Sequence, residues 1–173
     1  SRNPTPRFLL ISSLAAREPD LSPYAASKRM GEIALTKVAD RLTWTALRPP
    51  AVYGPGDREM LPLFRLMLRG IAPVVGGNDA RFSMLYVGDL ADAVVKWLAS
   101  DSRENRVFEL DDGHPGGYSW WESVEAVGRR RGKGVVRVRV PGPVLNLAAK
   151  LNMMAASVIG YRPMFTLGKV REL

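Results

Sequence analysis

The sequence contains no cysteine and one histidine, His114. Without cysteine the chain forms no disulfide, thiolate zinc site or iron–sulfur cluster, and it offers no cysteine nucleophile. One histidine is too few for a multi-histidine metal site, so we predict no metal centre, and it leaves a single candidate base for a Ser-His-Asp triad. His114 lies in the turn DDGHPGG, where we interpret it as a loop residue. The lack of cysteine also fits the reducing cytoplasm, the compartment that we predict.

Two kinds of sequence pattern are absent as well. The 173 residues contain neither G-x-G-x-x-G after the first strand nor a P-loop lysine, so the phosphate-binding turn of a dinucleotide site is missing from this chain. The longest apolar stretch, residues 144–159, is interrupted by Lys150 and is shorter than the ~20 residues that cross a bilayer. We predict an amphipathic helix there, which covers a substrate pocket or forms core or oligomer contacts.

The composition is that of a soluble folded protein, with 46% hydrophobic and 24% charged residues. A length of 173 residues suits one domain of ordinary size. The first apolar run is too short for a secretory signal. Because a strand is predicted within a few residues of Ser1 and no methionine precedes it, we expect the chain to be part of a longer protein.

Positive charge is in excess, with 25 Lys and Arg against 17 Asp and Glu. Its main local source is a run of cations between residues 129 and 139: Arg129, Arg130, Arg131, Lys133, Arg137 and Arg139. A solvated helix end, where cations complement the helix dipole, is the favoured interpretation, and a patch for an anionic surface is the alternative. Aromatic residues do not interleave with the run, so we predict no nucleic-acid partner, while membrane-surface contact stays open.

Strand and helix patterns alternate along the chain. Residues 7–12 (RFLLIS) have the pattern of a fully buried parallel strand, and Ser22 with Pro23 marks the start of a helix that runs to about Asp40. Further strands are predicted at 43–48, 81–87, 107–110 and 135–140, and further helices at 59–69, 89–99 and 118–131. This alternation predicts an α/β fold with a parallel sheet.

Three local features refine these elements. Asp89 is expected to cap the helix at 89–99. Valine and arginine alternate over 135–140, as on a strand that is buried on one face. Arg48 precedes two prolines, where we expect it to anchor a loop by hydrogen bonds rather than to contact a substrate.

The candidate chemistry lies near the start of the chain. Tyr24 and Lys28 are one helical turn apart and share a face, and Ser12-Ser13 end the preceding strand. A cation beside a phenol stabilises the phenolate, and a serine hydroxyl can hydrogen-bond a substrate oxygen on which charge develops. Together these groups predict a hydroxyl/carbonyl redox site. The alternative is a solvated helix pair beside a strand that merely ends in serine.

The motifs over residues 7–100 resemble the extended short-chain dehydrogenases/reductases, the NAD-dependent epimerase/dehydratase family. LLISSLAA is similar to the family's strand that ends in the catalytic serine, and SPYAASKRMGE to its active-site helix. LRPPAVYGPGD is similar to the strand and loop past the nicotinamide, and RFSMLYVGDLADAV to a later strand and helix. The resemblance implies the C-terminal half of a Rossmann-type doubly wound parallel sheet plus a small α/β substrate-binding part. Residues 1–100 would form the active-site half and 101–173 the substrate-binding part, intermixed with 50–85.

The resemblance also assigns residue roles. Tyr24 would be the acid-base catalyst, Lys28 would hold the nicotinamide ribose and tune Tyr24, and Ser13 would polarise the substrate. The residues implied to bind the cofactor, NAD or NADP, are Ser12, Lys28, Pro49, Pro50, Ala51 and Val52.

The resemblance implies an NAD(P)-dependent oxidoreductase that acts on a small molecule and pairs as a homodimer. Nucleotide-sugar members usually carry asparagine where this chain has Ala51, so a lipid- or sterol-like substrate is favoured. Two alternatives stay open: a nucleotide-sugar epimerase or dehydratase, and a non-catalytic member that serves as a scaffold or binds anionic surfaces.

Overall fold

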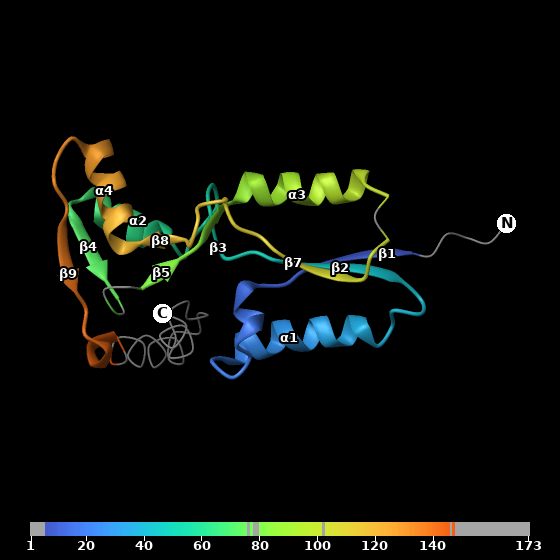
Figure 1. Cartoon of the computed structure of the whole chain (residues 1–173). Coiled ribbons are helices and arrows are strands. Elements are labelled where there is room, and N and C mark those ends of the chain that lie inside the picture. The colour runs from blue at the N-terminus through green and yellow to red at the C-terminus, as the bar shows by residue number, and fades with distance from the viewer. Residues whose placement is uncertain (1–5, 76, 78–79, 102, 146, 148–173) are drawn as a thin grey trace. The chain divides into compact units, whose positions relative to one another are not determined.

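The computed structural model describes residues 6–75, 77, 80–101, 103–145 and 147. The chain divides into two compact units (Figure 1). The first contains the residues up to 54 together with 84–113, and the second contains 55–83 together with the residues from 114 onward.

The first unit is built on a three-stranded parallel sheet. Its strands are β1 (Arg7–Ile11), β2 (Thr43–Arg48) and β7 (Arg106–Glu109), in the order β1-β2-β7. The central strand β2 is largely buried, as a sheet covered on both faces requires. The prediction of a fully buried first strand was wrong, because Phe8 is 46% and Ile11 is 38% exposed. Among the described residues, β1 pairs with β2 alone and is an outer strand of the sheet.

Helices α1 (Pro23–Thr36) and α3 (Val87–Ala99) cover opposite faces of this sheet (Figure 1). On one face, Leu35 of α1 packs with Trp44 and Ala46. On the other, the indole N–H of Trp97 in α3 donates to Thr45 Oγ1 at 2.9 Å. Successive β2 side chains therefore serve different helices, and the predicted α/β fold with helices on both faces of a parallel sheet is confirmed.

The sequence located the start of α1 but not its end. Ser22 caps the helix by accepting a hydrogen bond from Ala25 N at 3.0 Å, and Pro23 occupies the first turn. The helix ends at Thr36 rather than at about Asp40, and turns lead into β2. The stretch from Thr36 onward includes β-branched and aspartate residues, which favour a helix weakly.

The single strand expected at 81–87 is two strands with different partners. β5 (Arg81–Phe82) pairs antiparallel with β8 (Tyr118–Ser119) in the second unit. β6 (Met84–Tyr86) pairs parallel with β3 (Ala51–Tyr53) in the first unit. The chain changes unit between the two strands, a change that a continuous apolar pattern does not reveal.

The predicted cap of α3 was also wrong. The helix begins at Val87, two residues before Asp89, and its N-cap Tyr86 makes no side-chain capping bond. Asp89 lies instead in the first helical turn. A carboxylate there still interacts favourably with the positive end of the helix dipole, which explains the similar sequence signal.

The second unit packs two helices, α2 (Leu61–Leu68) and α4 (Trp120–Arg131), with a two-stranded parallel sheet of β4 (Ile71–Val74) and β9 (Val136–Arg139). Its core contains Met67, Ala72 and Val124. A reciprocal capping box starts α4: Glu122 N donates to Ser119 Oγ at 3.1 Å, and Ser119 N donates to Glu122 Oε2 at 2.6 Å.

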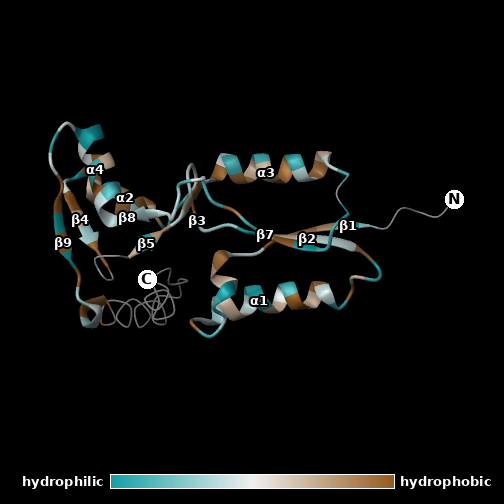
Figure 2. Cartoon of the chain, viewed as in Figure 1, coloured by the Kyte–Doolittle hydropathy of each residue, from teal (hydrophilic) through white to brown (hydrophobic). Residues whose placement is uncertain are grey.

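The expected buried face of the strand at 135–140 was not found, because both alternating sets in β9 are exposed. Val136 is 66% and Val138 is 47% exposed, as a strand at the edge of a small sheet permits. Figure 2 shows both hydrophobic and hydrophilic residues along β9. Of the helix predicted at 144–159, only 144, 145 and 147 are described, and they are helical. Within the described ranges, no helix has the length and apolar character needed to cross a bilayer.

Candidate active site

The residues predicted to form the site all belong to the first unit. They come from the segment that follows β1, the first two turns of α1 and the segment that follows β2. Because β1 and β2 are parallel neighbours, both of these segments leave the same edge of the sheet. The topology thus gathers the predicted residues at the carboxyl ends of two adjacent strands.

Lys28 connects α1 to the end of β1. Its Nζ donates a hydrogen bond to the Ile11 carbonyl oxygen at 3.1 Å and lies 5.6 Å from the centroid of the Tyr24 ring. Tyr24 itself is 48% exposed. The ammonium is therefore held between the strand end and the phenol, within the distance at which a cation interacts with an aromatic ring.

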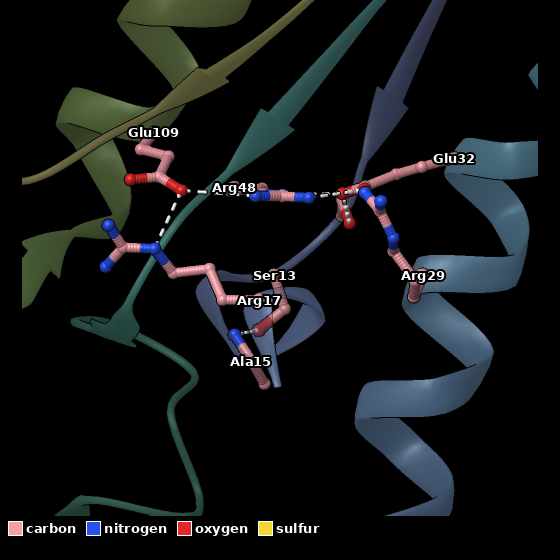
Figure 3. Close-up of polar contacts among 8 residues, drawn as sticks. Ser13, Ala15, Arg17, Arg29, Glu32, Arg48 and Glu109 are labelled. Atoms are coloured by element: carbon pink, nitrogen blue, oxygen red, sulfur yellow. Dashed lines mark hydrogen bonds and ion pairs between the residues drawn. The ribbon is translucent and has the colours of Figure 1, made fainter. Parts of the chain in front are cut away.

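Ser13 caps the short 3₁₀ helix η1 (Leu14–Arg17) that follows β1. Its Oγ accepts a hydrogen bond from Ala15 N at 3.2 Å (Figure 3). That bond occupies one lone pair and leaves the hydroxyl proton to be donated. Ser13 is partly buried, and its hydroxyl is oriented by the backbone that it caps.

Ser12 has a different environment from its neighbour. It is 2% exposed, and its Oγ donates to Glu32 Oε1 at 2.6 Å. Its backbone N–H donates to the Leu47 carbonyl at 2.7 Å, which extends the pairing of β1 with β2 by one residue. The Ser12 hydroxyl proton is thus committed to a carboxylate inside the unit.

The Pro49–Val52 segment is attached to the residue after Ser13. The Pro49 carbonyl accepts from Leu14 N at 2.9 Å. Pro49 is buried, Pro50 and Val52 are partly buried, and Ala51 is exposed at the start of β3. The segment brings apolar side chains into the strand-end region that also contains Ser13.

Sequence reasoning missed Glu32 and did not identify the partners of Arg48. Arg48 donates to Glu32 through Nε at 2.8 Å and Nη2 at 2.6 Å, and through Nη1 to Glu109 at 3.1 Å (Figure 3). It bridges two carboxylates, and these bonds hold the strand end directly before the proline loop. The available signal was position: Glu32 shares the face of α1 that contains the buried Ala25 and Leu35, where a charge needs a partner.

These contacts determine the charge state of Glu32. Burial raises its pKa, but hydrogen bonds from Arg48 and Ser12, together with the charge of Arg48, outweigh that effect and hold the pKa of Glu32 below its usual value. The same pairing raises the pKa of Arg48. The pair is therefore ionised at neutral pH.

His114 lies in a turn of the second unit, in agreement with its interpretation as a loop residue. Its ring stacks on Tyr118 with 4.3 Å between centroids, and its Nε2 lies 3.7 Å from Glu122 Oε1. Within the described part of the chain, no three His, Asp or Glu side chains come together as a metal site requires.

Comparisons with known proteins agree on one family. The sequence model of the NAD dependent epimerase/dehydratase family matches residues 7–110. A curated ceramide reductase from Caulobacter vibrioides (strain NA1000 / CB15N) is 40% identical over 167 residues, which are 96% of this chain and 51% of that protein. A sterol-4-alpha-carboxylate 3-dehydrogenase (decarboxylating) from Candida albicans (strain SC5314 / ATCC MYA-2876) is 35% identical over 82 residues, 45% of this chain and 23% of that protein.

Solved structures show the same likeness. MoeE5 in complex with UDP-glucuronic acid and NAD is 25% identical, with a TM-score of 0.64 over 78% of this chain and 51% of that one. The UDP-glucuronic acid 4-epimerase from Bacillus cereus in complex with NAD is 18% identical, with a TM-score of 0.67 over 96% of this chain and 57% of that one, and shares the fold. The chain spans about half the length of the curated ceramide reductase.

Proposed function

Because the chain belongs to the NAD dependent epimerase/dehydratase family, we propose that it supplies the active-site half of an NAD(P)-dependent oxidoreductase acting on a hydroxyl/carbonyl carbon. One observation carries the proposal. Lys28 Nζ is bonded to the last residue of β1 and lies 5.6 Å from the Tyr24 ring, so the ammonium, the phenol and the strand that leads to Ser13 are connected.

In this mechanism Tyr24 exchanges a proton with the substrate oxygen. The Lys28 ammonium stabilises the phenolate that remains when that proton leaves, because an opposite charge nearby favours the ionised form. The Ser13 hydroxyl, oriented by its bond from Ala15 N, donates to the same substrate oxygen as negative charge develops on it.

The chemistry of the side chains fits the nicotinamide half of the cofactor. An ammonium has three donors and the bond to Ile11 uses one, so Lys28 retains donors for ribose hydroxyls. Pro49, Pro50, Ala51 and Val52 supply apolar contacts for the nicotinamide ring, with Ser12 beside them on the neighbouring strand. NAD or NADP would bring the acceptor or donor of the hydride.

A lipid-like ketone or alcohol is the proposed substrate class. The 40% identity to a ceramide reductase covers almost the whole chain, and Ala51 lacks the amide that nucleotide-sugar members usually carry there. A nucleotide-sugar epimerase or dehydratase is the second candidate, supported by solved relatives in complex with UDP-sugars and NAD.

Three further assignments stay predictions. Residues 101–173, intermixed with 50–85, would bind the substrate. The protein would act in the cytoplasm as a homodimer with access to a membrane surface.

The test uses the protein produced from its own gene. We expect consumption of NADH or NADPH with lipid-like ketones, and a loss of about 10²–10⁴-fold in kcat for Tyr24→Phe. Tyr86→Phe is the matched control, because it removes the same hydroxyl from another exposed tyrosine of the first unit. Turnover of nucleotide sugars alone would refute the substrate class, and an unchanged kcat in Tyr24→Phe would refute Tyr24 as the acid-base catalyst. A parent protein without turnover of either class would favour the scaffold alternative.

A further inference from the structure

Glu32 is a buried carboxylate outside the group of residues that would touch substrate or cofactor. Its side chain is 3% exposed, yet it accepts four hydrogen bonds. Oε1 accepts from Ser12 Oγ at 2.6 Å and Arg48 Nε at 2.8 Å. Oε2 accepts from Arg48 Nη2 at 2.6 Å and Arg29 Nη1 at 3.2 Å. Each carboxylate oxygen thus accepts two hydrogen bonds. Arg48 binds Glu32 in the bidentate geometry, which fixes orientation as well as distance.

The network joins three strand ends to one helix. Ser12 follows β1, Arg48 ends β2, Glu109 ends β7, and Glu32 projects from α1 (Figure 3). Glu109 also pairs with Arg17 of η1 at 3.0 Å. A displacement of Glu32 would therefore change contacts at the ends of all three strands.

The network reaches Lys28 and Ser13 through short paths. Lys28 is one helical turn before Glu32 and bonds to Ile11, the residue before Ser12. Two successive turns of α1 are consequently attached to two successive residues of one strand end. Ser13 follows Ser12 directly, so the Ser12–Glu32 bond fixes the chain on one side of it.

The other side of Ser13 is fixed through Arg48. Pro49, the next residue after Arg48, accepts a hydrogen bond from Leu14 N at 2.9 Å. Arg48 is itself held by the two hydrogen bonds of its bidentate pair with Glu32. The backbone around Ser13 is therefore bound to Glu32 from both directions, once through Ser12 and once through Arg48 and Pro49.

Stability alone is a weak reason for this arrangement. A buried ion pair costs about as much in lost hydration as it returns in attraction, and apolar side chains of similar volume often serve a core as well. What the charged pair supplies is defined direction and distance. We propose that Glu32 is a positioning residue, and this proposal rests on the function proposed above. Through Ser12 and Arg48, it would set Lys28 Nζ and Ser13 Oγ in the geometry that catalysis requires.

The test is Glu32→Gln in the protein produced from its own gene, measured with its hydroxyl or carbonyl substrate and NAD(P). The amide keeps the shape but loses the charge and one acceptor. We expect kcat to fall about 10–100-fold, as small misplacements of reacting groups do, while KM changes less than about twofold.

Glu104→Gln is the matched control. It removes a carboxylate from an exposed pair with Arg106 in the first unit, outside the network, so kcat should stay within about twofold of the parent. Equal kcat values for the two variants would overturn the proposal. Tyr24→Phe is measured in parallel. If it retains activity, the proposed function fails. If Tyr24→Phe loses activity but Glu32→Gln keeps it, only the positioning role of Glu32 is refuted.

Ser12→Ala covers the case in which Glu32→Gln does not fold. It deletes the hydroxyl that bonds to Glu32 and leaves the Arg48 pair intact. The expected result is a smaller fall in kcat, with KM again nearly unchanged. A kcat equal to that of the parent would contradict positioning.

Discussion

Arginine has different roles in the two units of the chain. In the first, Arg48 is 11% exposed and bonds to Glu32 and Glu109. In the second, Arg129 is 68% exposed and pairs with a single, largely exposed carboxylate, Glu125. The run from 129 to 139 contributes surface charge, whereas Arg48 fixes strand ends. Burial and the number of partners, rather than local charge density, therefore distinguish a structural arginine from a solvated one.

The strongest test of this comparison removes one arginine from each unit. Arg48→Ala leaves the Glu32 carboxylate buried without its main partner and should lower the free energy of unfolding by about 3–5 kcal/mol. Arg129→Ala breaks an exposed pair and should cost about 0.5 kcal/mol or less. Urea titrations followed by circular dichroism measure both, and similar losses would mean that burial does not decide the roles.

A smaller effect is expected at the turn before β8 in the second unit. Gly117 has φ +69°, and a Cβ there would lie 2.9 Å from the Phe82 carbonyl oxygen. Gly117→Ala should therefore cost about 2 kcal/mol, from backbone strain and the clash together. Gly116 has φ +72° but its nearest neighbour is 3.9 Å away, so Gly116→Ala isolates the strain alone. Melting temperatures that fall equally for both would exclude the clash.

Removing a helix cap should cost nearly the same stability in either unit. Ser22 caps α1 and Ser119 caps α4, each with a bond from its oxygen to a backbone N–H. Replacing either serine with alanine should cost about 1 kcal/mol, because one helix-terminal N–H loses its acceptor. Urea unfolding of the two single variants compares them directly. A much larger loss at Ser22, which is buried, would show that burial raises the cost of removing a cap, as it raises the cost of removing one partner of an ion pair.

The smallest expected difference is in how the stability of the two units depends on acid pH. Burial raises the pKa of Glu32, but hydrogen bonds from Arg48 and Ser12 lower it by more than burial raises it. Hydrogen bonds from Ser119 lower the pKa of Glu122. A lowered folded-state pKa adds stability that is complete above the unfolded-state pKa and is lost as pH falls through the folded-state value. Glu32→Gln should flatten the acid limb measurably, and Glu122→Gln much less, because water screens an exposed group. Thermal melts between neutral and acid pH report the slopes.

Short-range signals made much of the first unit predictable. Ser22 and Pro23 sit at adjacent positions and act on the next turn, so the start of α1 was found from the sequence. The parallel sheet with helices on both faces followed from the alternation of strand and helix patterns. Residues 81–87 were misassigned because β5 and β6 pair with strands that lie far apart in sequence.

The same limit explains the unforeseen half of the site. The spacing of Tyr24 and Lys28 is visible within one helix, and the structure places their ring and ammonium 5.6 Å apart. Their catalytic roles stay predictions. Glu32 gains significance only from Arg48, which lies sixteen residues along the chain on another element. A sequence pattern records that a carboxylate is present, but its burial depends on a partner brought by the fold.

The position of β1 at the margin of its sheet has a practical consequence. Among the residues that the structure describes, no strand pairs with its outer side, and Phe8 is 46% exposed nearby. Such a row of amide and carbonyl groups is a template onto which any extended segment can add. The isolated chain should therefore be purified in dilute solutions without high salt, which limit self-association. Any aggregates should be rich in intermolecular β-structure.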